Sequence, residues 1–310
     1  MEIINGFEKT IEKSVVAIGF FDGVHIGHRE LIKKAVTLSR QKKCPCVVYT
    51  FSAHPIKTLF PDKEVYYITT NEQKAEIFES LGVDVVVFDD FARVKDMTPA
   101  LFVETVLLKL LGSDDVVCGY NFKFGKNNTG DIDTLSSLLS IYGKRLHVIP
   151  PVCAGESAVS SARIRFLINN GEVDVAEKLL DTPFTIKGEV VHGHRIGHML
   201  GFPTANVDVS TECVLLKRGV YYTKTFLDGQ EYESVTNVGV RPTVDDGQIE
   251  NVCETHVIGL DTDVYGRVIE IKFYKFAREE MKFPSFEILS QTLLKDVENC
   301  KEYFGKEKKA

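Results

Sequence analysis

Residues 15–28 read VVAIGFFDGVHIGH, and this stretch decides the fold of the first half of the chain. Its first part, from Val15 to Phe21, is an apolar run whose length and β-branched content predict a strand covered on both faces. After a glycine turn, residues 26–40 have the amphipathic spacing of a helix. The stretch therefore predicts a buried strand that runs through a turn into a helix, with two histidines where the helix begins.

The turn and the helix start form a candidate anion site. Backbone N–H groups in the first turn of a helix have no intrahelical partner and the helix dipole is positive there, so a phosphate is favoured. Gly23 and Gly27 carry no Cβ, which lets a phosphate approach the backbone. His25 and His28 can donate hydrogen bonds to the same phosphate. We therefore expect a nucleotide site that lacks the lysine of a P-loop.

The two halves of the chain differ in their patterns. Up to about Pro150, apolar strands alternate with helical patterns, which indicates a parallel sheet with helices on both faces. In such a sheet, ligands bind at the carboxyl ends of the strands. The expected strands are 46–51, 83–88, 116–119 and 145–149, and the expected helices are 71–81, 99–111 and 132–142.

From Phe184 onward, short strands are broken by Gly, Asp and Asn, which predicts an antiparallel barrel. A closing helix is expected from Phe286 to about Tyr303. The joint is expected in the helical run 163–180, which gives predicted domains of 1–182 and 183–310. The expected barrel strands are 219–226, 231–238, 254–259 and 268–276.

Composition limits the function classes. The 310 residues, 44% of them hydrophobic, are enough for two cores, and the net charge of −7 disfavours general binding to nucleic acid or acidic membranes. No apolar stretch reaches membrane-spanning length, and the acidic N-terminal segment does not have the pattern of a signal peptide. Seven scattered cysteines without a C-x-x-C pair indicate reduced thiols. We expect a cytoplasmic protein, either a monomer or a weak homo-oligomer.

The quoted stretch resembles the HxGH signature of adenylyl- and cytidylyltransferases, and more narrowly the GxFDGxHxGH form of bacterial FAD synthetases. This resemblance implies that His25 and His28 are the catalytic residues of a nucleotidyl transfer. The alternative interpretation of H-x-G-H is a solvated turn. The resemblance also implies ATP or FMN binding by four residues of the turn, Gly19, Phe20, Asp22 and Gly23.

Residues 50–55 read TFSAHP and match the family's T-F-x-x-H-P segment, which lies near the flavin and the phosphates. His54 precedes a proline and is held extended, so a simple strand-ending turn is the alternative. Residues 119–125, GYNFKFG, match the family's G-x-[DN]-F-x-F-G loop, in which Asn121 offers donor and acceptor atoms to the ligand. Phe122 and Phe124 can line a flat ring or anchor the loop, and anchoring is expected for at least one of them.

Residues 160–165 read SSARIR and resemble the family's S-S-T-x-I-R motif, which closes over the ATP phosphates. The resemblance assigns Ser160, Ser161 and Arg165 to ATP or FMN binding, since a guanidinium suits a bidentate phosphate contact. A serine pair before a helix is otherwise an ordinary cap. Ala162 replaces the usual threonine and removes one hydroxyl donor.

Residues 192–206 read HGHRIGHMLGFPTAN and match the long G-x-x-x-G-x-x-L-G-F-P-T-A-N signature of riboflavin kinases. The resemblance makes Thr204 and Asn206 oxygen ligands of Mg²⁺ and the ATP phosphates. His198 stands where the family commonly has arginine, which weakens a phosphate contact near neutral pH. The signature also assigns ATP or riboflavin binding to Gly193, Gly197, Gly201 and Pro203.

A zinc cluster is the alternative for the histidines of this segment, His192, His194 and His198. We disfavour a zinc site because no cysteine or carboxylate completes a ligand set nearby.

The match continues in family order through the second half and ends near Asp296. It implies that Glu254 is the general base, because phosphorylation of an alcohol needs a proton acceptor beside the hydroxyl. Without the match, a strand-surface carboxylate would be the preferred interpretation. Asn237 and Arg278 are assigned to ATP or riboflavin, although for Arg278 a salt bridge to a neighbouring glutamate, Glu279 or Glu280, is the ordinary expectation.

Because the resemblance covers the chain from about Ile18 to Asp296, it implies a bifunctional riboflavin kinase and FMN adenylyltransferase. The C-terminal half would phosphorylate riboflavin with ATP and Mg²⁺, and the N-terminal half would adenylylate the FMN product with a second ATP to give FAD and pyrophosphate. Two alternatives stay open. One is an adenylyltransferase for another phosphate, such as a pantetheine or nicotinate derivative, and the other is a non-catalytic flavin- or nucleotide-binding regulator.

Overall fold

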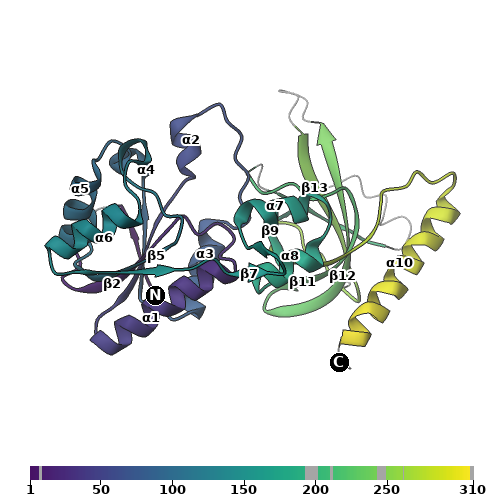
Figure 1. The fold of residues 1–310 in the computed structure, drawn as a ribbon. Helices are drawn as coiled ribbons and strands as arrows, with labels where there is room; N and C mark the ends of the chain where they lie inside the picture. The colour runs from purple at the N-terminus through teal and green to yellow at the C-terminus, as the bar shows by residue number, and fades with distance from the viewer. Residues whose placement is uncertain (7–8, 193–201, 210–211, 243–248, 261, 308–310) are drawn as a thin grey trace. The chain divides into compact units, whose positions relative to one another are not determined.

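The chain forms two compact units, Met1–Ser161 and Ala162–Ala310, in the computed structural model (Figure 1). Each unit contains a sheet of its own and is described by itself. The structure describes residues 1–6, 9–192, 202–209, 212–242, 249–260 and 262–307.

The first unit is built on a six-stranded parallel sheet with the order β1-β4-β3-β2-β5-β6. All five residues of β2 are buried, as expected for a central strand. The chain moves from β2 to β3 and β4 on one side and returns with β5 on the other, so the strand order reverses at β2. Ligands of such sheets bind at this switch point, beyond the carboxyl ends of the strands. The strands are β1 (Glu2–Asn5), β2 (Ser14–Ile18), β3 (Cys46–Phe51), β4 (Val85–Asp89), β5 (Ser113–Gly119) and β6 (Arg145–Ile149).

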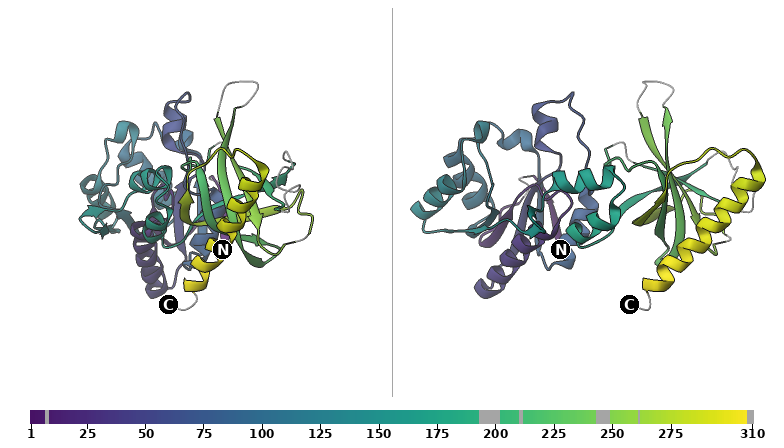
Figure 2. Two further views of the ribbon diagram at one scale, coloured as in Figure 1. Left: turned by 90° about the vertical axis from the view of Figure 1, so that its right-hand side faces the viewer. Right: turned by 45° about the vertical axis from the view of Figure 1, so that its right-hand side comes forward.

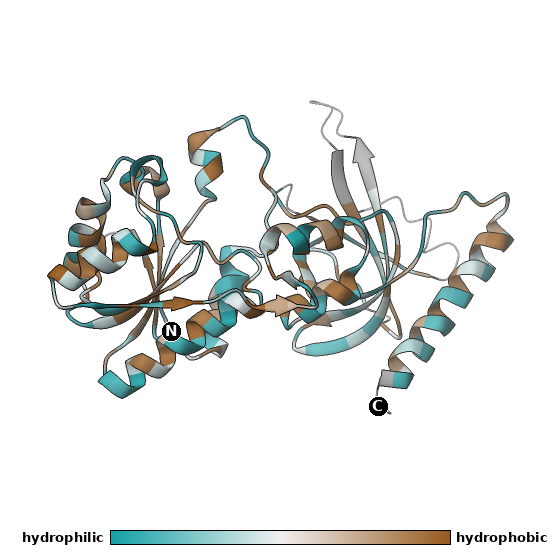
Figure 3. Ribbon diagram, viewed as in Figure 1, coloured by the Kyte–Doolittle hydropathy of each residue, from teal (hydrophilic) through white to brown (hydrophobic). Residues whose placement is uncertain are grey.

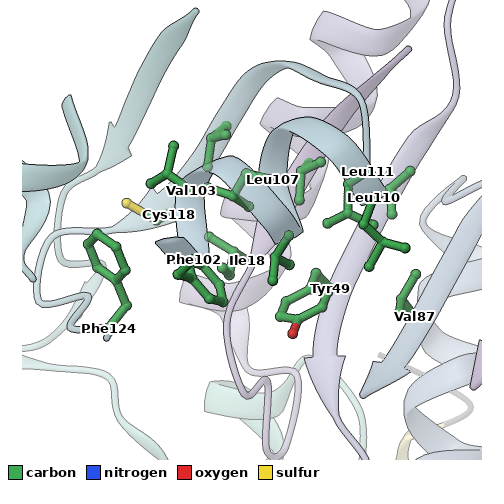
Figure 4. Close-up of a cluster of buried hydrophobic side chains, with 14 of the residues drawn as sticks. Ile18, Tyr49, Val87, Phe102, Val103, Leu107, Leu110, Leu111, Cys118 and Phe124 are labelled. Atoms are coloured by element: carbon green, nitrogen blue, oxygen red, sulfur yellow. The ribbon is translucent and has the colours of Figure 1, made fainter. Parts of the chain in front are cut away.

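Helices cover both faces of this sheet because successive strand residues point to opposite sides. Val15 and Ala17 of β2 pack toward α1 (Ile26–Lys42) and α3 (Asn71–Ser80). Val16 and Ile18, which point to the other face of β2, pack with Tyr49 against the opposite helical layer (Figure 4). That layer consists of α4 (Phe91–Val94), α5 (Pro99–Phe102), the π-helix η1 (Val103–Leu110) and α6 (Ile132–Ile141). The predicted fold class of this half is therefore confirmed.

Several boundaries differ from the prediction. The strand expected to reach Phe21 ends at Ile18, because the backbone turns at Gly19 and Phe21 has a positive φ of 56°. The single helix expected over 99–111 changes from α-helical to π-helical hydrogen bonding at Val103. Elements of the first unit without a sequence prediction are β1, α2 (Pro55–Leu59), α4, the 3₁₀ turn η2 (Lys126–Asn128), β7 (Cys153–Ala154) and β8 (Ser157–Ala158).

The second unit begins with two helices in place of the single helical run that was expected, α7 (Ser161–Asn169) and α8 (Val173–Leu180), which Gly171 separates with a φ of 80°. A closed antiparallel barrel follows, in the order β10-β13-β12-β11-β14-β9. The barrel strands are β9 (Phe184–Val191), β10 (Ala205–Asp208), β11 (Gly219–Leu227), β12 (Gln230–Pro242), β13 (Ile249–Val257) and β14 (Val268–Arg278).

The closing helix α10 (Phe286–Glu307) runs along the outside of the barrel (Figure 2). It carries hydrophobic and hydrophilic residues along its length (Figure 3), and Cys300 and Phe304 pack on Val220 and Val235 of the barrel wall. The predicted barrel with a terminal helix is therefore confirmed. No helix in the described parts of the chain has the length and apolar character needed to cross a membrane.

The barrel interior holds a set of hydroxyl side chains that bond to one another. Thr223 Oγ1 lies 2.8 Å from Ser234 Oγ and 2.7 Å from Thr236 Oγ1, and Thr236 in turn contacts Thr255. These side chains are fully buried, and buried polar groups need such partners. The pairing helps to fix the register of β11, β12 and β13.

Candidate active sites

The first site begins where β2 ends. The turn that follows contains three residues with positive φ, Phe21 at 56°, Gly23 at 80° and Val24 at 38°. Glycine adopts this conformation freely, but a β-branched valine does so rarely, and such strain is typical of functional turns. The turn is therefore held in an unusual shape at the switch point of the sheet.

Neighbouring segments hold the turn in this shape. Asp22, only 2% exposed, accepts hydrogen bonds at Oδ1 from the backbone N–H groups of Ile68 (3.0 Å) and Thr69 (3.3 Å). In this structure the carboxylate braces the turn, and its predicted contact with ATP or FMN stays a prediction. Three further hydrogen bonds join the Thr50 hydroxyl to the Phe20 carbonyl (3.0 Å), the Gly23 N–H to the Thr69 hydroxyl (3.0 Å), and the Ser161 hydroxyl to the Asp22 carbonyl (2.9 Å).

The two histidines lie together at the start of α1. His25 is the N-cap residue, and its Nδ1 accepts a hydrogen bond from the His28 backbone N–H at 3.3 Å. The two rings stack with their centroids 3.6 Å apart. Gly27 leaves room for the His25 ring, since a Cβ there would lie 3.2 Å from the ring in a tight contact. Because Nδ1 of His25 is an acceptor, neutral His25 carries its proton on Nε2, where it can be donated.

Both rings are neutral at pH 7. Burial lowers the pKa of His25 to about 4. The pKa of His28 lies well below 6.5, first because of burial and then because of the neighbouring His25 and Lys74 charges. His28 Nδ1 is also buried without a hydrogen-bond partner among the described residues. The pair can therefore offer N–H groups to a phosphate, but not a positive charge.

This neutrality gives a pH prediction. An exposed histidine gains its proton as the pH falls through about 6.5, whereas His25 stays neutral down to about 4. In an NMR titration of the free enzyme, the His25 imidazole shift should stay constant from about pH 8 to about pH 5.5, well above its lowered pKa. A midpoint near the ordinary histidine value would contradict the buried arrangement.

Other predicted residues lie around the same edge of the sheet. His54 caps α2, with its Nδ1 accepting from the Ile56 N–H at 3.1 Å, and its ring packs edge-on against Phe20 at 4.5 Å. Asn121 is exposed just beyond the end of β5. Phe124 is buried in the core, which confirms that at least one phenylalanine anchors this loop.

The serine and arginine motif is divided between the two units. Ser160 is exposed, and Ser161 begins α7 and contacts the turn. Arg165 lies further along α7, within the second compact unit, so its phosphate contact stays a prediction.

Sequence reasoning missed Lys74 at this site. This residue of α3 is 1% exposed, and its Nζ lies 4.2 Å from the centroid of the Phe20 ring. A lysine in an amphipathic helix normally lies in solvent, and no motif singled it out.

The second site is a cavity of about 270 Å³ in the barrel unit. Polar side chains of Thr204, Asn237 and Glu254 line it, and apolar side chains such as Phe283 and Leu293 form another part of its wall. The predicted ligand-binding residues Gly193, Gly197 and Gly201 lie outside the described residues, as do His194 and His198 of the zinc alternative. The remaining histidine of that alternative, His192, packs on the Tyr265 ring at 4.0 Å.

Strand pairing brings together three predicted residues from three different strands. Glu254 on β13 lies directly opposite Asn206 on β10 and opposite Asn237 on β12. Asn206 is 5% exposed, and its Oδ1 has no hydrogen-bond partner among the described residues. Directly paired residues share one face of a sheet, so one carboxylate and two amides lie side by side, and Glu254 and Asn237 line the cavity.

Two contacts hold the rim of the cavity. His256 donates from Nδ1 to the Pro203 carbonyl at 2.9 Å and so fixes the segment before Thr204. Arg278 forms a bidentate ion pair with Asp296 of α10, at 2.7 Å for Nη2–Oδ2. The expected partners Glu279 and Glu280 were wrong, since Asp296 takes up the guanidinium. Arg278 lines the cavity, and its contact with a ligand stays a prediction.

Comparison with known proteins agrees with this arrangement of two sites. A family model described as FAD synthetase matches residues 7–163, and one described as riboflavin kinase matches residues 180–304. A curated bifunctional riboflavin kinase/FMN adenylyltransferase from Listeria monocytogenes is 35% identical, with 96% of this chain and 95% of the relative covered. The chain belongs to the bifunctional riboflavin kinase/FMN adenylyltransferase family.

A second curated relative and a solved structure are similar over nearly the same length. The Escherichia coli K12 bifunctional riboflavin kinase/FMN adenylyltransferase is 33% identical, over 96% of this chain and 95% of its own. A solved structure described as a macrolide-efflux protein from Streptococcus pneumoniae superposes with a TM-score of 0.86 at 28% identity, covering 96% of this chain and 98% of that one. The predicted family and the order of its two activities are therefore confirmed by the two family models and the curated relatives.

Proposed function

We propose that this chain catalyses both steps that convert riboflavin to FAD. The barrel unit transfers the γ-phosphoryl group of ATP to riboflavin and gives FMN. The parallel-sheet unit transfers the adenylyl group of a second ATP to FMN and gives FAD and pyrophosphate. The observation that carries the proposal is the presence of two separate sites on one chain. One is the stacked histidine pair at the switch point, and the other is the barrel cavity lined by Glu254 and Asn237.

In the adenylyl transfer, an FMN phosphate oxygen attacks the α-phosphorus of ATP and pyrophosphate leaves. The FMN phosphate is mostly a dianion above about pH 6, so it needs no strong base. His25 donates from Nε2 and His28 donates from its ring to the phosphate oxygens, where negative charge grows as pyrophosphate departs. The N-terminus of α1 adds free backbone N–H groups at the same point.

In the kinase reaction, the riboflavin 5′-hydroxyl attacks the γ-phosphorus of ATP. Glu254 accepts the hydroxyl proton, which makes the oxygen a better nucleophile. The apolar wall of the cavity suits the flavin ring system. Asn237, whose amide donates to Glu280 Oε1 at 3.2 Å, keeps a polar group beside the base.

The oxygen donors of this second site fit a magnesium ion. Mg²⁺ prefers oxygen ligands, and the buried Asn206 Oδ1 has no protein partner among the described residues. Asn206 and the Thr204 hydroxyl would hold the ion, which when bound neutralises charge on the ATP phosphates. The unpartnered Asn206 Oδ1 supports the assignment of a metal to this site.

We expect Asn206→Ala to raise the Mg²⁺ concentration that gives half-maximal riboflavin phosphorylation by at least about tenfold, because one ligand is lost. Asn170→Ala, at an exposed position of the same unit, is the matched control and should leave this concentration unchanged. A Mg²⁺ titration of kinase activity measures the effect, and an unaltered titration curve in Asn206→Ala would remove Asn206 from the metal site.

The remaining assignments belong to the same proposal. We assign the adenylyltransferase domain to 1–182 and the kinase domain to 183–310. Riboflavin, FMN and ATP are the partners, and neither nucleic acid nor membrane is among them. We place the enzyme in the cytoplasm.

Incubation of the purified chain with riboflavin, ATP and Mg²⁺, followed by chromatography, tests the proposal. FMN should form first and FAD second. An adenylyltransferase for a pantetheine or nicotinate phosphate would leave riboflavin unchanged, and a non-catalytic regulator would bind flavin without product.

A further inference from the structure

Lys74 is a buried ammonium that the reaction described above does not use. It is 1% exposed, and its described contact is with the face of the Phe20 ring, 4.2 Å from the centroid. The carboxylate whose charge acts on the Lys74 ammonium is that of Asp22, which favours the charged form. Removing an ammonium from water without an anionic partner is costly, and a ring face compensates only part of the cost. The fold therefore keeps a buried positive charge whose desolvation the Phe20 ring and the charge of Asp22 offset only in part.

The position of this charge is set by the turn of the first site. Lys74 lies one turn into α3, whose N-cap Thr70 follows the Thr69 that hydrogen-bonds to both Gly23 and Asp22. The lysine is close enough to interact electrostatically with His28 and with Asp22. Its ammonium is thus fixed beside the histidine pair by the same contacts that hold the turn.

Substrate phosphates that bind beside the neutral His28 need a positive charge close to them. His25 and His28 are neutral, Asp22 is an acid, and the nearby Arg29 donates from Nε to the Val24 carbonyl at 3.1 Å. FMN and ATP together bring several negative charges to this point. A fixed cation in a site of low dielectric stabilises such charge without reorganisation.

We propose that Lys74 is a positioning residue of adenylyl transfer, whose buried ammonium balances the phosphates that bind beside His25 and His28. This inference rests on the proposed function. It assigns the positive charge of the site to Lys74 and the hydrogen-bond donors to the histidines.

Burial lowers the pKa of Lys74 to about 8, so the ammonium is mostly charged at pH 7 and loses its proton as the pH rises through that value.

The test compares Lys74→Met, Lys74→Arg and, as matched control, Lys33→Met at an exposed position of α1. With FMN and ATP at pH 7, Lys74→Met should lower kcat for FAD formation by at least about tenfold, while riboflavin phosphorylation by the same preparation stays unchanged. Lys33→Met should leave both reactions unchanged. Lys74→Arg should retain most of the activity, since the charge is kept.

The pH profile separates the charge from a purely structural role. The wild-type rate of FAD formation should fall as the pH rises through about 8. In Lys74→Arg the rate of FAD formation should not fall over this pH range, because arginine stays protonated to above about pH 12.

Wild-type activity in Lys74→Met, or an unaltered alkaline fall in Lys74→Arg, would overturn the inference. If Lys74→Met does not fold, the profiles of wild type and Lys74→Arg still decide it. Failure of the wild type to make FAD would instead refute the proposed function.

Discussion

His28→Ala is expected to lower FAD formation from FMN by about 10²–10³-fold, the usual effect of removing one preorganised donor from a developing anion. His28 stacks on His25 at 3.6 Å, and its buried Nδ1 has no protein partner among the described residues. The alanine variant loses the ring that the turn holds in place for the phosphates. The measurement is the chromatographic rate of FAD formation with saturating FMN and ATP.

The kinase activity of the same variant serves as the control for His28→Ala. Riboflavin phosphorylation should continue at the wild-type rate, because the barrel unit has its own core and its own cavity. His28→Asn keeps an N–H donor and should recover part of the lost activity. If His28→Ala formed FAD as fast as the wild type, the histidine pair would not be the adenylyl-transfer site.

Glu254→Gln is expected to lower riboflavin phosphorylation by about 10²–10⁴-fold, the range typical of a lost general base. Glutamine keeps the size of the side chain between Asn206 and Asn237 but cannot accept the hydroxyl proton. FMN production from riboflavin and ATP measures the loss, and FAD formation from added FMN should be unaffected.

Glu231→Gln is the matched control, since Glu231 lies on β12 of the same barrel and pairs with Lys224 at 2.8 Å. It should leave both activities at the wild-type level. Full kinase activity in Glu254→Gln would leave Glu254 as an ordinary strand-surface carboxylate and require another base.

The first site could be predicted largely from sequence because its parts are local. The apolar run of β2, the glycine turn and the histidines at the start of α1 follow one another directly along the chain. The positive φ of Val24 could not be predicted, since contacts with a distant segment around Thr69 hold the turn. Lys74 could not be predicted either, because its burial depends on packing against Phe20.

The second site depends on strand register, which the sequence pattern does not specify. Glu254, Asn206 and Asn237 meet because β13 pairs with both β10 and β12, and only the family resemblance brought them together beforehand. For Arg278, sequence neighbours suggested the wrong partner, because the ion-pairing carboxylate comes from α10. Local patterns predict elements well, but they do not identify contacts between distant elements.

The most direct test of the account follows phosphorus from ATP into flavin. Riboflavin is incubated with the chain, Mg²⁺ and ATP labelled at either the α or the γ position, and the flavins are separated. Two sequential reactions predict γ-label in FMN and in FAD, and α-label in FAD alone. FAD without γ-label, or FMN that carries γ-label but never gives α-labelled FAD, would contradict the claim that one chain carries both activities.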